Sequence, residues 1–424
     1  MRRPLLLVFI ILIIFSIIKT KNDDYFQREE NIEIYGVVKL KVEKENYIEY
    51  DIDKFLVRDY NRKFEVNVGD IVYVNGKIKD LAKISSSEFN YINYIKGRGY
   101  EGLVYSSYYE VVGYNEFYIF LNNIFLYMKD TTRYLYKENS DFINSLLLGL
   151  KTDLSEEESD MFSKTGTSHI VAISGMHIGI LASIIILFFG KINRIYKIIL
   201  VLIISVFYSI MIGFSPSIIR AIGFMGLNHF SYFIDMKNDS ISNLSLIGIL
   251  FVTNNPYIIC NVSFQLSFLG MLSIAYFYRI INKKINNKFI SITLSANILT
   301  LPVVYYIFGN VSLLSIFGNL IVSPFIAIII YLSIMSILLF KINLFFCDII
   351  VSVNRFIINA IYFLLDKVSN IEFLYFEFYE TNFLLVVIYY IVIFSYIIYY
   401  ETYKTVKNSN KERTFMNEEE NRGI

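Results

Sequence analysis

The sequence has no tryptophan, two cysteines, three histidines and five prolines in 424 residues, and little charge of either sign. Cys260 and Cys347 lie far apart in apolar surroundings, so we expect buried free thiols rather than a disulfide or a metal site. The formal net charge is +1, and this balance points to no partner by bulk electrostatics. Because 55% of the residues are hydrophobic, the composition excludes an ordinary soluble domain and favours a polytopic α-helical membrane protein.

Long apolar runs predict the membrane-spanning segments. Residues 5–18 form such a run behind Arg2 and Arg3, and no small-x-small cleavage pattern follows it. We therefore expect residues 1–20 to be an uncleaved anchor rather than a signal peptide. Residues 169–400 predict a membrane domain with about nine spans. These spans are expected near residues 170–189, 197–213, 217–234, 241–253, 257–278, 289–308, 312–340, 345–365 and 382–400.

The distribution of Lys and Arg orients these spans, because basic loops stay in the cytoplasm. On this rule, the N-terminus and the charged tail of residues 401–424 are cytoplasmic. The loop 366–380 carries four acidic residues against one lysine and is expected on the other side. The chain is therefore predicted to be a multi-pass protein of the cell membrane, with residues 21–115 extracytoplasmic.

Residues 21–115 alternate apolar and polar positions in β-branched runs such as IEIYGVVKLKVEK and GDIVYVNGKIKDL. Gly, Asn and Asp turns separate these runs, which predicts a small β-barrel of about five strands, like an OB-fold. Such barrels bind single-stranded nucleic acid, and tyrosines stack on bases, but the same aromatics are also favoured as strand formers. The segment has 14 Lys and Arg against 17 Asp and Glu, which argues against binding driven by phosphate charge.

Residues 116–168 have a mixed character and predict interfacial and amphipathic helices. Residues 117–136 suit a helix that lies at the membrane surface rather than a span. Ser155 and Glu158 form a capping box, so a short helix is expected from about residue 156 to residue 164, with Gly166 at its C-terminal end. This helix would deliver His169 to the next span.

Polar residues at the edge of a membrane span are costly and are candidates for function. In HIVAISGMHIGI, residues 169–180, the start of a span is surrounded by His169, Ser174, Gly175 and His177. Three roles stay open: a polar or tightly packed border of a path, a plain interface, and a serine nucleophile with a histidine base. No third catalytic residue is evident, and the spacing of the histidines matches no known metal site.

A buried cation is predicted in the segment FSPSIIRAIGF. Ser215 and Pro216 form a favourable helix start, and Arg220 follows in the second turn. A helix N-terminus beside a buried arginine suits an anion such as phosphate, whereas the alternative is an arginine that extends to the membrane surface.

Two further segments supply polar groups inside the predicted spans. Ser263 and Gln265, in NVSFQLSF, suit either a polar path or hydrogen bonds between helices. Pro302 and Pro324 are expected to break or kink their spans, which a membrane tolerates where the backbone borders a cavity or is buried in protein.

Several segments, in order, resemble the ComEC family of competence proteins. SLLLGLKTDLSEEESDMFSKTGTSHIVAISGMHIGIL is similar to the family's LLLG, short acidic helix and H-x-x-A-I-S-G-x-H. SPSIIRA, NPYIICNVSFQLSFLGM and LTLPVVYYIFGNVSLLSIFGNLIVSP resemble three later family segments. EFNYINYIKGRGYEG resembles the end of the family's external domain, with Asn90 where Asp is usual. The resemblance covers about residues 30–340.

This resemblance implies a membrane channel for the uptake of single-stranded DNA during natural transformation. It implies no cofactor and no catalytic residue. The implied partners are single-stranded DNA, the lipid bilayer, a competence DNA receptor, a separate nuclease and a cytoplasmic motor, and a homo-oligomer is left open. Carried over residue by residue, the candidates for the DNA path are His169, Ser174, Gly175, His177, Arg220, Ser263, Gln265 and Pro302.

The sequence differs from the ComEC family in two respects, and two other functions stay open. Many members continue into a metallo-β-lactamase-like domain, whereas this sequence has no H-x-H-x-D-H cluster, so we expect no nuclease activity. Only one predicted span precedes the barrel, where members often have two or more. The alternatives are an intramembrane serine hydrolase that uses Ser174 with His177 or His229, and a transporter of another polyanion.

Overall fold

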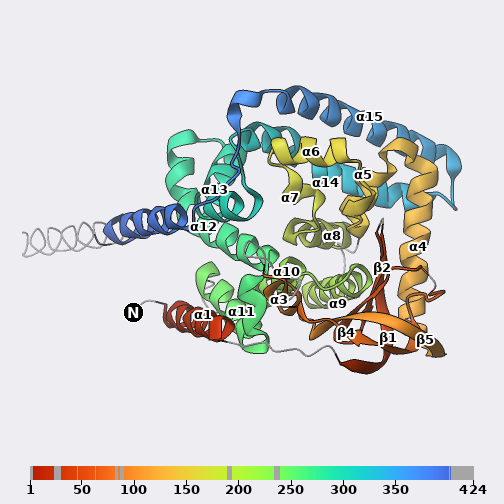
Figure 1. Cartoon of the computed structure of the whole chain (residues 1–424). Helices are drawn as coiled ribbons and strands as arrows, with labels where there is room; N and C mark the ends of the chain where they lie inside the picture. Colours follow the sequence, from red (N-terminus) through yellow and green to blue (C-terminus); the bar gives the residue numbers. More distant parts are fainter. Residues whose placement is uncertain are drawn as a thin grey trace, which may run out of the picture.

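The structure, a computed structural model, describes residues 3–22, 30–44, 46–62, 64–81, 85, 90–188, 193–233, 239–400 and 402. An N-terminal helix, α1 (Pro4–Asn22), precedes a small β-barrel, and most of the remaining described chain is helical. In Figure 1 the barrel lies at one end of the molecule, whereas the helix Phe383–Tyr400 projects from the opposite end. The predicted tail of residues 401–424 lies outside the described residues, apart from residue 402.

Five strands close into a barrel in the order β1-β2-β3-β5-β4, which confirms the prediction of a small OB-like barrel. All neighbours are antiparallel except β3 and β5, which run parallel. Burial alternates along β4, as the period of two requires, and valines such as Val38, Val57, Val72 and Val104 fill the interior. The strands are β1 (Asn31–Glu43), β2 (Ile48–Ile52), β3 (Phe55–Asp59), β4 (Asp70–Ile78) and β5 (Gly102–Tyr114).

A short helix, α3 (Tyr91–Gly97), closes one side of the barrel between β4 and β5. Its N-cap is Asn90, whose side chain accepts a hydrogen bond from the backbone N–H of Asn93. Ile95 of α3 is fully buried and packs in one cluster with Leu56 and Leu103 of the barrel strands. The C-terminal end of α3 is therefore fixed with respect to the barrel.

The rest of the described chain consists of helices joined by short turns, with one two-stranded sheet, β6 (Asn310–Ser312) with β7 (Tyr375–Glu377). Four of the described segments are short 3-10 helices: η1 (Lys137–Asn139), η2 (Lys151–Asp153), η3 (Pro256–Cys260) and η4 (Glu372–Leu374). The α-helices are α4 (Glu116–Tyr136), α5 (Ser140–Leu148), α6 (Glu156–Lys164), α7 (Ser168–Val171), α8 (Gly175–Phe188), α9 (Arg194–Ile212), α10 (Pro216–Phe233), α11 (Ser240–Asn254), α12 (Val262–Ile285), α13 (Lys288–Phe308), α14 (Ser315–Leu339) and α15 (Leu344–Ser369).

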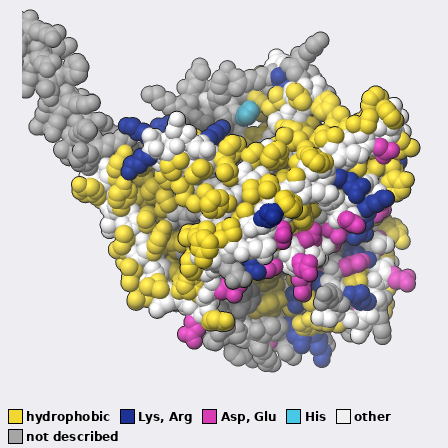
Figure 2. Space-filling view, turned by 90° about the horizontal axis from the view of Figure 1, so that it is seen from above, with side chains coloured by type: hydrophobic (Ala, Val, Ile, Leu, Met, Phe, Trp, Pro, Cys, Tyr) yellow, Lys and Arg dark blue, Asp and Glu magenta, His cyan; other side chains and the backbone are white. Residues whose placement is uncertain are grey.

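Seven of the described helices are long and apolar enough to cross a membrane: α1, α9, α12, α13, α14, α15 and Phe383–Tyr400. The helices α8 and α11 are apolar but shorter. Figure 2 shows a broad apolar surface between basic side chains at one end and a mixed group of acidic and basic side chains at the other. This arrangement confirms the polytopic helical membrane fold.

A break or a kink is expected at each proline, and the structure contradicts the break, because neither proline interrupts its helix. Pro302 and Pro324 lie inside the uninterrupted helices α13 and α14. A proline at position 302 leaves the carbonyl of Ile298 without its usual helical donor. The hydroxyl of Tyr389, on the last described helix, donates a hydrogen bond of 3.0 Å to this carbonyl, so the lost interaction is replaced.

The largest hydrophobic core joins α4 and α5 to α14 and α15. Within it, the hydroxyl of Tyr136 lies 2.8 Å from Ser336 Oγ, and Asn354 Nδ2 donates to Tyr136 and to Ser333. Such a network stabilises one arrangement of helices, because a buried polar group without a partner costs about 1–3 kcal/mol.

The segment between α6 and α8 packs against the start of α14. The predicted capping box is confirmed, since Ser155 Oγ accepts from Glu158 N and Glu158 Oε2 accepts from Ser155 N. After α6 the chain turns at Gly166, whose φ of 64° suits glycine. The turn then lies so close to Gly318 of α14 that an added Cβ there would be 2.5 Å from the Thr165 carbonyl oxygen.

We expect Gly318→Ala to lower the free energy of unfolding by about 1–3 kcal/mol, because the added methyl group collides with backbone that cannot move aside. Gly226→Ala is the matched control: Gly226 lies inside α10, and nothing lies within 4 Å of the added carbon. Thermal unfolding of both variants in detergent, followed by circular dichroism, checks this. Equal stability of the two variants would contradict the close packing.

Candidate functional site

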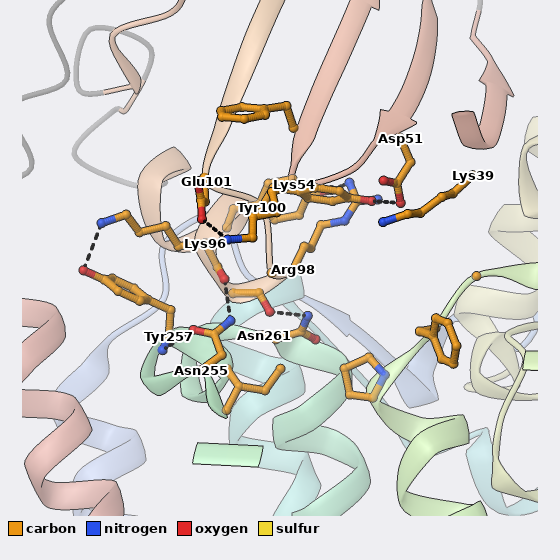
Figure 3. A pocket seen from close by; sticks show the side chains of 18 of the residues that line it. Lys39, Asp51, Lys54, Lys96, Arg98, Tyr100, Glu101, Asn255, Tyr257 and Asn261 are labelled. Carbon is orange, nitrogen blue, oxygen red and sulfur yellow. Dashed lines mark hydrogen bonds and ion pairs between the residues drawn. The ribbon is translucent and has the colours of Figure 1, made fainter. Parts of the chain in front are cut away.

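A cavity of about 1940 Å³ lies between the barrel and the ends of the membrane helices (Figure 3). On the barrel side it is lined by β1, by the β2–β3 turn, and by α3 with the loop that follows it. On the other side it is lined by the α9–α10 link and by the segment from the end of α11 through η3 to the start of α12. This cavity is therefore placed where the barrel meets the helices.

Two asparagines hold the barrel to the helices at the edge of this cavity. Asn255 Nδ2 donates a hydrogen bond of 2.7 Å to the carbonyl of Lys96, and Asn261 Nδ2 donates one of 3.1 Å to the carbonyl of Gly97 (Figure 3). These carbonyls belong to the last turn of α3, where helical partners are missing. Gly97 permits this contact, since a Cβ there would be 3.1 Å from the Tyr257 carbonyl.

The side-chain oxygen of each asparagine also caps the N-terminus of a helix. Asn255 Oδ1 accepts from Tyr257 N at the start of η3, and Asn261 Oδ1 accepts from Phe264 N at the start of α12. An aspartate would serve as the cap but has no N–H to donate to α3. The asparagine amide therefore couples the starts of two helices to the position of the barrel.

The charges around the cavity balance. Lys54 Nζ lies 2.8 Å from Glu101, and Lys39 Nζ lies 3.8 Å from Asp53, so two of the cations are in partly exposed ion pairs. Such pairs contribute little stability, which leaves them free to exchange partners. The ionisable side chains that line the cavity are Lys39, Lys54, Lys96 and Arg98 against Glu30, Asp51, Asp53 and Glu101.

Among the acidic side chains that line the cavity, Asp51 is the one whose pKa is shifted by burial. Its Oδ2 accepts a hydrogen bond of 2.8 Å from the hydroxyl of Tyr100, whereas Oδ1 is buried without a partner among the described residues. Burial raises the pKa of the Asp51 carboxyl above its ordinary value, and the hydrogen bond from Tyr100 offsets part of this effect. Asp51 therefore gives up its proton less readily than an exposed aspartate.

Four of the predicted site residues lie together at the contact between α8 and α10. Ser174 precedes α8, and its backbone N–H donates to His177 Nδ1 at 3.1 Å. A Cβ on Gly175 would lie 3.4 Å from Nη2 of Arg220, so the guanidinium of α10 is beside the first residue of α8. His177 Nε2 and Arg220 Nε are both buried and have no hydrogen-bond partner in the described part of the chain.

The arrangement of Ser174, Gly175, His177 and Arg220 is electrostatically unusual. Arg220 is 7% exposed, and no acidic side chain within the described ranges forms an ion pair with it. It also lies at the N-terminus of α8, where the helix dipole is positive. A buried cation in this position is a favourable surrounding for an anion, and the burial of Arg220 does not match the alternative of an arginine that extends to the membrane surface.

The other predicted site residues are placed elsewhere. Ser263 lines the cavity itself, and Gln265 Nε2 donates to the carbonyl of Ile259, which holds η3 against α12. His169 is exposed on α7, with Nδ1 3.1 Å from the carbonyl of Gly166. Pro302 is buried inside α13. The structure thus brings together Ser174, Gly175, His177 and Arg220, and places Ser263 on the cavity wall.

The geometry does not favour the serine hydrolase alternative. Ser174 Oγ lies 3.2 Å from His177 Nδ1, but the same nitrogen already accepts the Ser174 backbone N–H. Ser174 Oγ in turn accepts from Met176 N, which is the role of a helix cap. Within the described residues no acid orients His177, whose Nε2 has no partner, so the third group of a triad is not in place.

Most of the residues that line the cavity were not predicted from the sequence. Asn255 and Asn261 are the first and last residues of NPYIICN, and Gly97, Arg98 and Tyr100 lie in KGRGYEG. A glycine-rich turn with adjacent charges was the available signal for the second segment. However, its contact with a helix start about 160 residues later is not encoded by any local pattern.

The fold and this site define a multi-pass membrane protein with a small barrel docked on its helices. The family model described as Competence protein matches residues 146–403. The match covers more than half of the chain, so the chain belongs to the competence protein family, and the resemblance to ComEC proteins is confirmed.

A curated relative is the ComE operon protein 3 of Bacillus subtilis (strain 168), which is 27% identical over 201 residues. The alignment covers 46% of this chain and 26% of that protein, so the chain spans about a quarter of the relative's length. No solved structure matches the chain.

We expect Asp51→Asn to raise the thermal stability, and the gain to depend on pH. Because the folded pKa is raised, the unfolded chain releases this proton at lower pH, so ionised Asp51 costs stability at neutral pH. The gain should therefore be largest near pH 7–8 and should vanish as the pH falls towards about 4. Asparagine keeps the acceptor for Tyr100.

The measurement is thermal unfolding of the purified protein from pH 4 to pH 8. Asp53→Asn is the control, because Asp53 is exposed on the adjacent turn, and its change should stay within about 0.5 kcal/mol at each pH. A gain for Asp51→Asn that does not vary with pH would contradict the assigned role of the charge.

Proposed function

We propose that this protein takes part in the uptake of single-stranded DNA across the cell membrane during natural transformation. The barrel would lie outside, the N-terminus and the tail would lie in the cytoplasm, and the helices would form the path. Membership of the competence family supports the DNA role, and the seven apolar helices support the membrane location. A separate nuclease, a DNA receptor and a cytoplasmic motor are the partners that this role requires.

The observation that carries the proposal is the cavity between the barrel and the helix ends. A strand that reaches the membrane from outside meets the barrel first, and the cavity connects the barrel with the starts of α10 and α12. Ser263, predicted as a path residue, lies on its wall. Polar backbone and side chains at such a depth are tolerated where they border a water-filled space.

The charges around the path suit a polyanion that must pass rather than stay. Lys54 and Lys39 are in weak, partly exposed ion pairs, which a phosphate group can replace without leaving a buried charge unpaired. Deeper in the protein, Arg220 supplies a cation without an acidic partner. A path that held each phosphate strongly would slow the release of the strand.

We expect deletion of the gene to abolish the internalisation of labelled donor DNA and to leave DNA binding at the cell surface intact. Arg220→Met should lower internalisation by about tenfold or more, because a hydrogen bond to a charged group contributes about 1.5–3 kcal/mol. Arg220→Lys keeps the charge and should retain much of the activity. The measurement is the DNase-protected cytoplasmic label, with His177→Ala assayed in parallel.

Protein stability separates a path role for Arg220 from a role in folding. Arg220 has no ion-pair partner among the described residues, so Arg220→Met should leave the thermal stability unchanged or higher. Internalisation that is unchanged in the deletion strain would refute the proposal. Competition by polyphosphate but not by DNA would instead identify another polyanion as the cargo.

We expect Cys260 to report on occupancy of the cavity. Cys260 is partly exposed and lines the cavity, whereas Cys347 is fully buried, so a small methanethiosulfonate reagent should label Cys260 alone. Single-stranded DNA should slow this labelling, because it fills the space that the reagent must cross. Cys260→Ser is the control and should remove the label, and a labelling rate that DNA does not change would contradict a DNA-filled cavity.

A further inference from the structure

Six tyrosines lie along one side of the barrel and are linked by three ring contacts and two arginines. The ring centroids of Tyr105 and Tyr60 are 5.2 Å apart, and those of Tyr60 and Tyr47 are 5.1 Å apart. Further along, Tyr91 and Tyr94 are 5.6 Å apart. We call Tyr105, Tyr60, Tyr47, Tyr91, Tyr94 and Tyr100 the aromatic track.

Two arginines bridge the gaps between these rings. The Arg58 guanidinium lies 4.6 Å from the ring centre of Tyr47 and 5.8 Å from that of Tyr91. Arg98 does the same for the other end of the track, at 5.5 Å from Tyr94 and 5.3 Å from Tyr100. The cation–π contacts fix the planes of the rings and keep positive charge beside them.

The track leads from the outer surface of the barrel into the cavity. Tyr94, Arg98 and Tyr100 line the cavity, whereas Tyr60, next to Tyr105 at the far end, is 49% exposed. Lys79 Nζ lies 4.7 Å from the ring centre of Tyr105 and extends the positive charge to that end. The exposed rings and the cavity wall therefore belong to one surface.

Strand propensity does not explain this surface. Only Tyr105 of the track lies in a strand; Tyr91 and Tyr94 are on α3, and Tyr60, Tyr47 and Tyr100 are in turns or loops outside the strands. Rings that come from a strand, a helix and three connecting segments meet on the solvent side of the barrel. Tyr60 and Tyr94 are exposed, whereas the other four rings of the track are partly buried and leave only part of each ring accessible. Accessible aromatic rings provide faces on which planar groups stack.

The charge on the track is modest. Glu49 is buried and pairs with both arginines, at 3.0 Å from Arg58 and 3.7 Å from Arg98. A ligand that is recognised mainly by its phosphates would require a stronger positive field than this. A ligand with unstacked aromatic bases is better suited to the six rings, and duplex DNA hides the faces of its bases.

We propose that the aromatic track binds single-stranded nucleic acid by stacking on its bases and leads the strand into the cavity. The inference rests on the proposed function, of which it identifies the first binding site. On this proposal, the protein recognises the strand by its bases rather than by its phosphate backbone.

The test is binding of a fluorescein-labelled, mixed-sequence single-stranded oligodeoxynucleotide to the purified full chain in detergent, measured by anisotropy. Tyr60→Leu keeps an apolar side chain but removes the ring that contacts both neighbours, and should weaken binding by roughly 5- to 150-fold, as expected for the loss of one stacked base. Tyr60→Phe keeps the ring and should bind like the wild type. Tyr108→Leu is the matched control, since Tyr108 is an exposed tyrosine that contacts Tyr73 instead.

The ligand is varied in the same assay. An abasic oligonucleotide of equal length, the duplex and polyphosphate should each bind much more weakly, and the affinity for the single strand should fall only slowly with salt. Equal affinity of Tyr60→Leu and wild type, equal binding of the abasic strand, or no binding of the oligonucleotide would overturn the inference. Labelling of Cys260 in each variant, at the wild-type rate, verifies that the barrel remains folded and docked.

Failure of the inference differs from failure of the proposed function. If DNA internalisation requires the chain but Tyr60→Leu binds and transports normally, only the track is refuted. If the deletion strain internalises DNA normally, the uptake function is refuted whatever the oligonucleotide assay gives.

Discussion

The two carbonyl groups at the end of α3 and the asparagine amides that bind them hold the barrel in place on the helices. A helix end must find donors for its last carbonyls, and here the starts of η3 and α12 supply one donor to each, in addition to the Gly99 N–H that the Lys96 carbonyl accepts. Since Asn255 and Asn261 cap those helices with their oxygens, a movement of the barrel would disturb two helix starts at once. The cavity, its wall at Ser263 and the inner end of the aromatic track all depend on this contact.

The buried polar groups of the protein fall into two kinds. In the core between α4, α14 and α15, the Asn354 amide nitrogen and the Tyr136 hydroxyl are hydrogen-bonded, although Asn354 Oδ1 is buried without a partner in the described part of the chain. At the contact between α8 and α10, Arg220 Nε and His177 Nε2 are likewise buried without partners among the described residues. Arg220 differs in carrying a charge, and a buried cation without an acidic partner costs stability that a bound anion would offset.

The features that follow from local chemistry were predictable from the sequence. The period of two gave the barrel, the Ser155–Glu158 pair gave the start of α6, and Ser215–Pro216 gave the start of α10. Of the break or kink predicted at Pro302, the break does not occur, and the carbonyl that this proline leaves without a helical donor is bonded by Tyr389, on a helix distant in sequence. Likewise, the approach of Arg220 to Gly175 and of Asn261 to Gly97 joins segments 45 and 164 residues apart, and no local pattern carries that information.

A balanced cavity and a stacking surface together describe a particular way of handling a polyanion. Strong positive fields concentrate DNA but release it slowly, which suits storage or packaging. Here Glu49 offsets the arginines of the track, and the acidic residues around the cavity equal the basic ones in number. Contacts with bases are individually modest and are sequence-tolerant, since every base has a face. On the proposed function, a strand held in this way would advance by exchanging one stacked base for the next. Arg220, a buried cation without an acidic partner among the described residues, would then meet the phosphates.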